Sequence, residues 1–173
     1  MNFGGGDFVK SKLNNKNIWS VVMMALIIAF DQITKYLAKS YLAPDKSVDF
    51  IKGFVEFRYA ENTGVAFSFF SGGRWFFIAF TAIIIVACIV YMFKKTQNNL
   101  WLYWSLGVVI AGAVGNLIDR IVLSYVVDFI NPTFVNFAIF NIADCAVTLG
   151  AVSLVACLLT DAFKKDNKEK SNE

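Results

Sequence analysis

The sequence predicts an all-α membrane protein with four transmembrane helices and a small β-sheet outside the membrane. Hydrophobic residues fill 57% of the 173 positions, and the chain contains 18 phenylalanines. Soluble domains average roughly half apolar residues, so lipid is the expected solvent. The apolar residues also fall into four runs. At this length we expect one helical bundle and no separate soluble module.

The first helix is expected to carry charge into the membrane. Residues 1–17 are polar and are interpreted as a mobile cytoplasmic lead-in. The apolar run that follows, Ile18 to Phe30, is shorter than the roughly 20 residues needed to cross a hydrocarbon core. The helix must therefore continue through the polar residues at 31–35. A cleaved signal peptide is the alternative, but no small-residue cleavage site follows promptly and three more apolar runs come later.

Three further runs complete the predicted bundle. The segment from Trp75 to Phe93 is uncharged, and Leu100 to Ile118 follows it after a short polar turn, so the two are expected to form a helical hairpin. The fourth span is expected to begin near Ala138 and to end near Thr160. Residues 164–173 then form a charged cytoplasmic tail, which we expect to be disordered.

Lysines near the span ends predict the orientation of the bundle. With four spans, nine lysines fall on one side, which is expected to be the cytoplasm and to hold both termini. The opposite side holds Tyr41 to Arg74 and Ile121 to Phe137, of which the first carries four basic residues partly balanced by four acidic ones. The nine lysines are Lys10, Lys12, Lys16, Lys94, Lys95, Lys164, Lys165, Lys168 and Lys170.

The first outer segment contains the pattern of a strand. Val55, Phe57 and Tyr59 alternate with charged residues, which is the period of two that gives a strand one apolar face. An amphipathic sheet beside a bilayer is expected to rest its apolar face at the level of the lipid headgroups. A loosely packed loop is the alternative.

The composition excludes several kinds of active site. The chain contains no histidine, which excludes Ser-His-Asp and Cys-His catalysis and any histidine-ligated metal site. Cys88, Cys145 and Cys157 lie in or beside apolar runs and form no Cys-x-x-Cys pair, so they are expected to be free thiols packed in helices. We see no basic patch of the kind that binds nucleic acid.

Four aspartates fall in or near the membrane, where a charge costs at least roughly 2.5 to 3.5 kcal/mol. Asp31 has Lys35 one helical turn away, a spacing that favours an ion pair and suits a structural or orienting role. Asp119 lies beside Arg120, which shares a helix face with Asn116. A guanidinium in such a polar cluster binds carboxylates or carbonyls, so a structural role is also sufficient there.

Asp128 and Asp144 differ from the other two. Neither has a basic residue within four positions, so nothing local offsets their charge. If the fold brings them together, one keeps its proton and a water held between them becomes a nucleophile, as in aspartic proteases. The structural alternative is a helix cap or a buried hydrogen-bonded carboxyl, which is a serious alternative for Asp144 because it follows Asn141 near a predicted helix start.

Five blocks of sequence, in order and at compatible spacing, resemble lipoprotein signal peptidase, also called signal peptidase II. The resemblance runs from about residue 20 to 160. The blocks are residues 31–35 (DQITK), 62–67 (NTGVAF), 112–120 (GAVGNLIDR), 126–129 (VVDF) and 140–144 (FNIAD).

The resemblance implies a protease domain over residues 18–163, with four membrane helices and an outer β-cradle at about 44–70. It implies an aspartic endopeptidase of the bacterial cytoplasmic membrane, which removes the signal peptide from prolipoproteins just before a cysteine that carries a diacylglyceryl group. The active site is then expected toward the outer face. No metal or organic cofactor is implied. The expected partners are lipid-modified prolipoproteins and membrane lipids, with no nucleic acid and no obligatory protein partner.

The family's catalytic aspartates correspond to Asp128 and Asp144, the pair that the local argument also favours. Asn62 and Arg120 are expected to donate toward substrate carbonyls, and neutral amides such as Asn116 are expected to orient the aspartates. The positions that match the family's substrate-binding or orienting residues are Asp31, Lys35, Asn62, Gly64, Asn116, Arg120, Asn141 and Ala143.

Three positions depart from the family's usual pattern. Val65 stands where a small alanine is usual, Cys145 follows the second aspartate where a small residue such as serine is common, and the leader is rich in glycine. Val65 affects the expected specificity and not the reaction class.

Other functions remain open from the residues alone. Intramembrane Asp and Lys also relay ions in small transporters and proton channels, and polar residues also hold structural membrane subunits together. A Ser-Lys protease that pairs Lys35 with Ser68 or Ser71 is chemically possible without histidine, although nothing in the sequence places these groups together.

Overall fold

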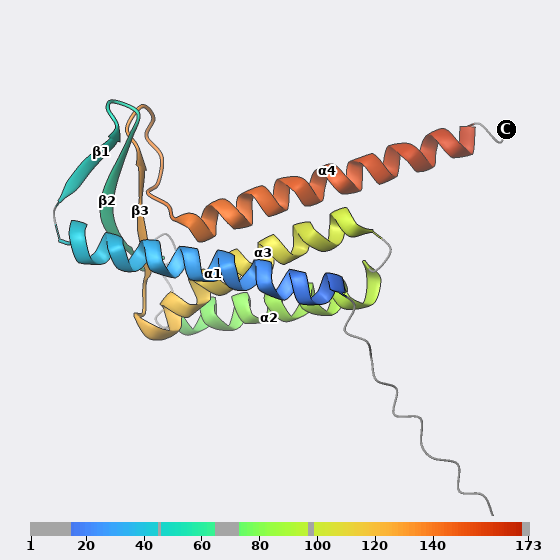
Figure 1. Cartoon of the computed structure of the whole chain (residues 1–173), viewed down its shortest axis with the longest axis horizontal. Coiled ribbons are helices and arrows are strands. Elements are labelled where there is room, and N and C mark those ends of the chain that lie inside the picture. The colour runs from blue at the N-terminus through green and yellow to red at the C-terminus, as the bar shows by residue number, and fades with distance from the viewer. Residues whose placement is uncertain (1–14, 45, 65–72, 97–98, 171–173) are drawn as a thin grey trace, which may run out of the picture.

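Four long helices and a three-stranded sheet make up the fold (Figure 1). The computed structural model describes residues 15–44, 46–64, 73–96 and 99–170. The helices are α1 (Asn15–Leu42), α2 (Gly73–Lys95), α3 (Leu100–Val122) and α4 (Ile142–Lys170). Each contains a stretch long and apolar enough to cross a membrane. The predicted four-span architecture is confirmed.

Helix α3 lies at the centre of the bundle and packs against the other three helices. About half of its apolar stretch (56%) is buried by protein, against 22% or less for each of the others, which leave most of their surface to lipid. Glycines allow the closest approach between α3 and α4. A methyl group on Gly112 would collide with the carbonyl oxygen of Ala143, and one on Gly150 would lie 2.7 Å from Val109.

The sheet stands at the end of the bundle where α1 ends and α4 begins (Figure 1). Strands β1 (Ser47–Ile51), β2 (Val55–Asn62) and β3 (Val126–Pro132) pair antiparallel in the order β1-β2-β3. The strand predicted from the alternation at residues 55–59 is confirmed as β2. Its pairing with β3 joins the first outer segment to the connection between α3 and α4.

Aromatic packing attaches the sheet to the helices. Phe129 of β3 is buried with Ala38 and Leu42 at the end of α1. Phe57 of β2 contacts the Phe129 ring with a centroid separation of 6.0 Å and stacks on Phe50 at 4.9 Å. The strand that carries Asp128 is therefore held against α1 by its neighbouring residue.

The structure corrects three predicted boundaries. The fourth helix begins at Ile142 and not near Ala138, because Phe140 pairs with Ile130 of β3. The tail predicted to be disordered continues α4 to Lys170, in a sequence rich in lysine, which favours helix. The third helix continues past Ile118 to Val122, because its polar residues find partners inside the protein. Of the lead-in predicted at residues 1–17, residues 15–17 belong to α1, and residues 1–14 lie outside the described residues, as do the cradle residues 65–70, Val65 included.

Candidate active site

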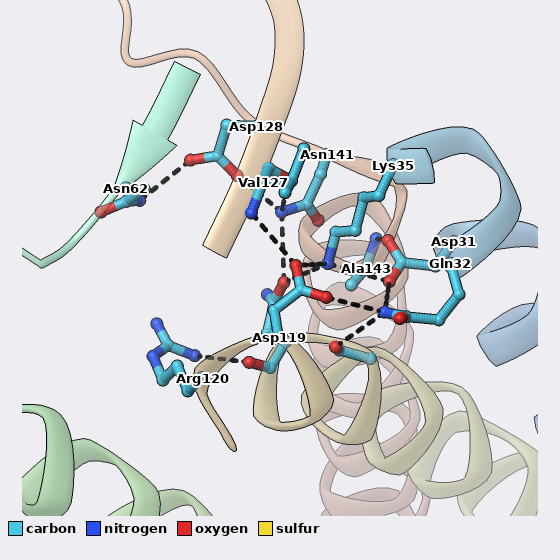
Figure 2. A network of polar contacts seen from close by, with 12 residues as sticks. Asp31, Gln32, Lys35, Asn62, Asp119, Arg120, Val127, Asp128, Asn141 and Ala143 are labelled. Atoms are coloured by element: carbon cyan, nitrogen blue, oxygen red, sulfur yellow. Dashed lines mark hydrogen bonds and ion pairs between the residues drawn. The ribbon is translucent and has the colours of Figure 1, made fainter. Parts of the chain in front are cut away.

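A single asparagine joins the two candidate catalytic aspartates. Asp128 lies in β3, where only 2% of its surface is exposed, and Asp144 lies in the first turn of α4. The side-chain amide of Asn141 donates to Asp128 Oδ1 at 2.6 Å, and its backbone N–H donates to Asp144 Oδ2 at 3.1 Å. Figure 2 shows the side chain of Asn141 pointing toward Asp128. The fold thus brings both carboxyl groups to one residue.

Asp144 also caps its own helix. Asn141 precedes α4, and its side-chain oxygen accepts the backbone N–H of Asp144 at 2.9 Å while Asp144 Oδ2 accepts the N–H of Asn141. This reciprocal pair is a capping box, so the cap expected as an alternative role for Asp144 is confirmed. The other oxygen, Oδ1, accepts the amide of Asn116 at 2.7 Å. Both oxygens of Asp144 are therefore fixed in direction.

The second oxygen of the Asp128 carboxyl group is bound by a residue of strand β2. Asn62 at the end of that strand donates to Asp128 Oδ2 at 2.9 Å. The orientation of the Asn62 amide is set by Gly64, whose backbone N–H donates to Asn62 Oδ1 at 2.9 Å. Gly64 adopts a φ of +74°, which favours glycine, and an added methyl group would lie 3.1 Å from the ring of Phe77.

The environment of Asp128 favours its protonated form. Burial raises the pKa of the Asp128 carboxyl from 3.8 to about 6, and the nearby charge of Asp144 raises it as well. The hydrogen bonds from Asn62 and Asn141 stabilise the carboxylate and act in the opposite direction, as does the charge of Lys35. Burial outweighs them.

Lys35 lies at the centre of a buried charge cluster next to these carboxyl groups. Its Nζ is 2.9 Å from Asp31 Oδ2, which confirms the predicted ion pair, and 3.0 Å from Asp119 Oδ2, a second partner that the sequence did not predict. It also donates to Asn116 Oδ1 at 2.9 Å. An ammonium group has three hydrogens, and these three bonds use them all. The geometry therefore argues against Lys35 as the base of a Ser-Lys protease, and Ser68 and Ser71 lie outside the described residues.

Both acidic members of the cluster bind backbone next to the candidate aspartates. Asp31 Oδ1 accepts the N–H of Ala143 at 2.8 Å, and Asp119 Oδ2 accepts the N–H of Val127 at 3.1 Å. Ala143 is fully buried, and it precedes Asp144 as Val127 precedes Asp128. The dashed lines in Figure 2 show these two contacts.

Arg120 faces the site from the last turn of α3. One of its guanidinium nitrogens donates to the carbonyl oxygen of Asn116 at 3.3 Å, and the group lies 5.7 Å from the centre of the Phe77 ring. It attracts Asp144 and Asp128 electrostatically. Most of the five N–H donors of an arginine are thus not used by these contacts.

A groove of about 570 Å³ opens beside Asp144. Its polar end is formed by Asn62 and Asp144, and the rest of its wall is mainly apolar. The other lining residues are Phe137, Ala138, Ile139, Phe140, Cys145, Thr148 and Leu149. Within the ranges that the structure describes, no group of three or more Cys, Asp and Glu side chains is arranged to hold a metal ion.

Comparison with known proteins identifies the family. A model of the signal peptidase (SPase) II family matches residues 23–160, which is most of the chain. The chain belongs to the signal peptidase II family. It is therefore a protease by family, and with its four apolar helices it is a multi-pass bacterial membrane protein.

Curated relatives and solved structures agree with the family model. Lipoprotein signal peptidases from Streptococcus pyogenes serotypes M6 and M5 are each 40% identical over 138 residues, which is 80% of this chain and 91% of theirs. Two structures described as bacterial membrane enzymes, solved by the in meso method, each superpose with a TM-score of 0.79. The first is 35% identical and covers 82% of this chain and 93% of its own, and the second is 34% identical and covers 84% and 90%.

The ten residues predicted from the sequence form one connected network in this family member. Hydrogen bonds and ion pairs link Asp31, Lys35, Asn62, Gly64, Asn116, Arg120, Asp128, Asn141, Ala143 and Asp144. Their catalytic and binding roles stay predictions.

Two members of the network were not predicted as site residues. Asp119 was assigned to the adjacent Arg120, but its side chain bonds to Lys35 and Gln32. Gln32 was noted only as part of the motif around Asp31. A usable signal for Asp119 was its spacing of three from Asn116, which places both on one face of the helix.

Proposed function

We propose that the chain is an aspartic endopeptidase that removes the signal peptide from diacylglyceryl-modified prolipoproteins by cleaving just before the lipidated cysteine. Asp128 and Asp144 are its catalytic pair. The observation that carries this proposal is the placement of Asn141, which holds one carboxyl group with its side chain and the other with its backbone. Two acidic groups held by one residue beside an open groove suit a shared water nucleophile.

The reaction follows from the chemistry of such a pair. The ionised aspartate removes a proton from water as the water oxygen attacks the carbonyl carbon before the cysteine. The protonated aspartate gives its proton to the carbonyl oxygen, and a tetrahedral diol forms. When the C–N bond breaks, the departing nitrogen of the cysteine takes the proton that the first aspartate removed from water, and one hydroxyl proton of the diol returns to the second aspartate. The products are a signal peptide with a carboxyl end and a lipoprotein with a free amine.

The electrostatic environment divides these two roles. The raised pKa of Asp128, about 6, suits it to carry the shared proton. Asp144 Oδ1 and Oδ2 accept hydrogen bonds from Asn116 and from the backbone of Asn141, which hold this carboxyl group in one orientation beside the groove. Asp144 is therefore the member that we assign as the base.

The surroundings of the pair fit a substrate that is itself anchored in lipid. The apolar wall of the groove next to Asp144 suits the hydrophobic part of a signal peptide, and Asn62 and Arg120 are the donors that we assign to its backbone carbonyls. Phe50 and Ile51 of β1 and Phe54 in the turn that follows are exposed and are expected to rest at the level of the headgroups. Such a substrate reaches the site by lateral diffusion.

The charge distribution supports an outer location for the site. Lys16, Lys94 and Lys165 lie at the helix ends away from the sheet, and the positive-inside rule assigns that end to the cytoplasm. Both termini are then cytoplasmic, and the sheet and the aspartates face outward across the bacterial cytoplasmic membrane.

One assay tests the substrate and the reaction together. The purified protein in lipid is incubated with a diacylglyceryl-modified prolipoprotein and, in parallel, with the unmodified precursor, and the new amino terminus is mapped by mass spectrometry. We expect cleavage directly before the modified cysteine and little cleavage of the unmodified precursor. Equal cleavage of both precursors, or a cut elsewhere, contradicts the proposed specificity. An inactive protein that instead passes ions across vesicles supports the transporter alternative.

A further inference from the structure

The buried cluster around Lys35 does more than neutralise charge in the membrane. We propose that Asp119 and Gln32, together with Asp31 and Lys35, form a clamp that sets the separation between the two catalytic aspartates. This inference rests on the proposed function, because it concerns the geometry of that pair. It assigns positioning roles to Asp119 and Gln32, which the sequence did not predict as site residues.

One arm of the clamp acts on Asp128. Asp119 in α3 is buried, with 3% of its surface exposed, and its Oδ2 accepts the backbone N–H of Val127 at 3.1 Å. Val127 is the residue before Asp128, so this bond fixes the strand at the point where it delivers the carboxyl group. The bond is not part of the pairing between β2 and β3; it ties the strand to helix α3.

The other arm acts on Asp144 in the same way. Asp31 in α1 is fully buried, and its Oδ1 accepts the backbone N–H of Ala143 at 2.8 Å. Ala143 is the residue before Asp144. The first N–H groups of a helix have no partner within the helix, so Asp31 both satisfies one of them and fixes the start of α4.

Lys35 and Gln32 join the two arms. The Lys35 ammonium lies between the carboxylates, 2.9 Å from Asp31 and 3.0 Å from Asp119. The Gln32 amide donates to Asp31 Oδ2 at 3.2 Å and to Asp119 Oδ1 at 3.0 Å. Figure 2 shows Asp31 and Asp119 on either side of Lys35. Lys35 and Gln32 both belong to α1. The positions of β3 and α4 are therefore both fixed relative to this one helix.

Asparagine cannot replace Asp119 in this arrangement. Asp119 Oδ1 accepts from Gln32, and Oδ2 accepts from both Lys35 and Val127. An asparagine has one oxygen and one NH₂ group, so one side of it must turn donors toward donors. In the clamp, this mismatch displaces the catalytic aspartates and lowers the rate of the folded enzyme. If Asp119 only stabilised the fold, the same substitution would lower the folded fraction and leave the rate per folded molecule unchanged.

The test uses Asp119→Asn and the milder Gln32→Met, with Asp161→Asn as the matched control. Asp161 is an exposed carboxylate near the far end of α4, bonded to Asn99. Each variant is purified in lipid, its folded fraction is measured by size exclusion and circular dichroism, and kcat and KM are determined per folded molecule. The affinity for a lipidated peptide with a secondary alcohol in place of the scissile carbonyl is measured alongside, because that group mimics the tetrahedral state.

The clamp predicts a loss in kcat at nearly unchanged KM. We expect Asp119→Asn to lower kcat about 100-fold, the loss typical of a small misplacement of reacting groups. Gln32→Met removes the hydrogen bonds to both carboxylates and should lower kcat about tenfold, at the low end of what the loss of hydrogen bonds to charged groups costs. Affinity for the alcohol peptide should fall in proportion to kcat, and Asp161→Asn should match the wild-type enzyme.

Two results separate the failure of the clamp from the failure of the proposed function. Wild-type kcat in folded Gln32→Met and Asp119→Asn, while Asp128→Asn is inactive, overturns the clamp and leaves the catalytic pair in place. Full cleavage by Asp128→Asn overturns the catalytic pair and the clamp with it. If Asp119→Asn does not fold, Gln32→Met decides alone, because it leaves both ion pairs of Lys35 intact.

Discussion

Removing the Asp128 carboxyl is expected to abolish a loss of stability that the wild-type protein undergoes as the pH rises, while it destroys activity. The folded state raises the pKa of Asp128 from 3.8 to about 6. A group whose pKa is raised by folding contributes stability below its unfolded pKa, and this stability is lost as the pH rises through the folded value. The difference between 3.8 and about 6 corresponds to about 3 kcal/mol of unfolding free energy, lost between roughly pH 4 and pH 7.

Asp128→Asn lacks this titration and keeps nearly the same shape. Its NH₂ group must face one of the two amides that donate to Asp128, a cost that is the same at every pH, so the titration shows in how the difference from the wild type changes with pH. The melting temperature of the variant minus that of the wild type should therefore rise between pH 4 and pH 8. For a chain of this size, about 3 kcal/mol corresponds to roughly 6 to 12 °C.

Thermal unfolding in detergent, followed by tryptophan fluorescence at several pH values, measures this difference. Asp161→Asn controls for the loss of one exposed carboxylate. Melting curves of Asp128→Asn and wild type that shift in parallel across this range, or a difference that shrinks as the pH rises, would refute the argument that burial dominates at Asp128.

Three further predictions concern how the site is built. Gly64→Ala strains a residue at positive φ by roughly 1 kcal/mol and loosens Asn62. Because the Asn62 hydrogen bond lowers the pKa of Asp128, its weakening should raise that pKa and move the alkaline limb of the pH–rate profile to higher pH. An unchanged limb contradicts this role of Asn62. Gly112→Ala should lower the unfolding free energy by roughly 1 to 3 kcal/mol, because the added methyl group meets the Ala143 carbonyl oxygen. An unchanged melting temperature would contradict the close approach of α3 and α4 at this position. Lys35→Met leaves two buried carboxylates without their cation and should lower the unfolding free energy by about 3 to 5 kcal/mol. A variant as stable and active as the wild type would contradict a structural role for the charge cluster.

The sequence predicts the helices of this fold well because lipid imposes a strong constraint on them. A span needs a long apolar run, and the runs around Trp75 and Leu100 are uninterrupted. The charged end of α1 was also predicted, since its apolar run is too short alone and Asp31 and Lys35 are one turn apart. These inferences depend only on residues close together in the chain.

Features that depend on distant contacts were not predicted. Strand β3 lacks the alternation of β2, because its first four residues are all buried, Asp128 among them. A short stretch without a period of two does not distinguish strand from helix. The contacts of Asp119 were not predicted for the same reason. Its neighbour Arg120 suggested a local pair, whereas in the fold the Asp119 carboxylate pairs with Lys35 of a distant helix. The start of α4 was misplaced because residues 138–140 continue the apolar run of the helix in sequence, whereas in the fold Phe140 pairs with Ile130 of β3.

The candidate site was predicted more completely than its geometry. Local neighbours identified Asp128 and Asp144 as carboxylates without a nearby cation, and the motif blocks supplied the amides around them. Neither argument indicated that Asn141 contacts both aspartates. Nor did either indicate that Lys35 joins the two carboxylates, Asp31 and Asp119, that bind the backbone next to them. Those facts depend on how α1, β3 and α4 meet, which is information that residue spacing does not contain.

Cleavage by Asp128→Asn and Asp144→Asn, each compared with wild type at equal folded concentration, tests the central claim most directly. Both variants keep the size of the side chain, and an asparagine at position 144 retains an oxygen for the cap of α4. With a diacylglyceryl-modified prolipoprotein in lipid, we expect each to lose cleavage at least 10³-fold, as expected when one of two cooperating catalytic groups is removed. A rate within a few-fold of wild type for either folded variant would contradict the assignment of the two aspartates as a catalytic pair.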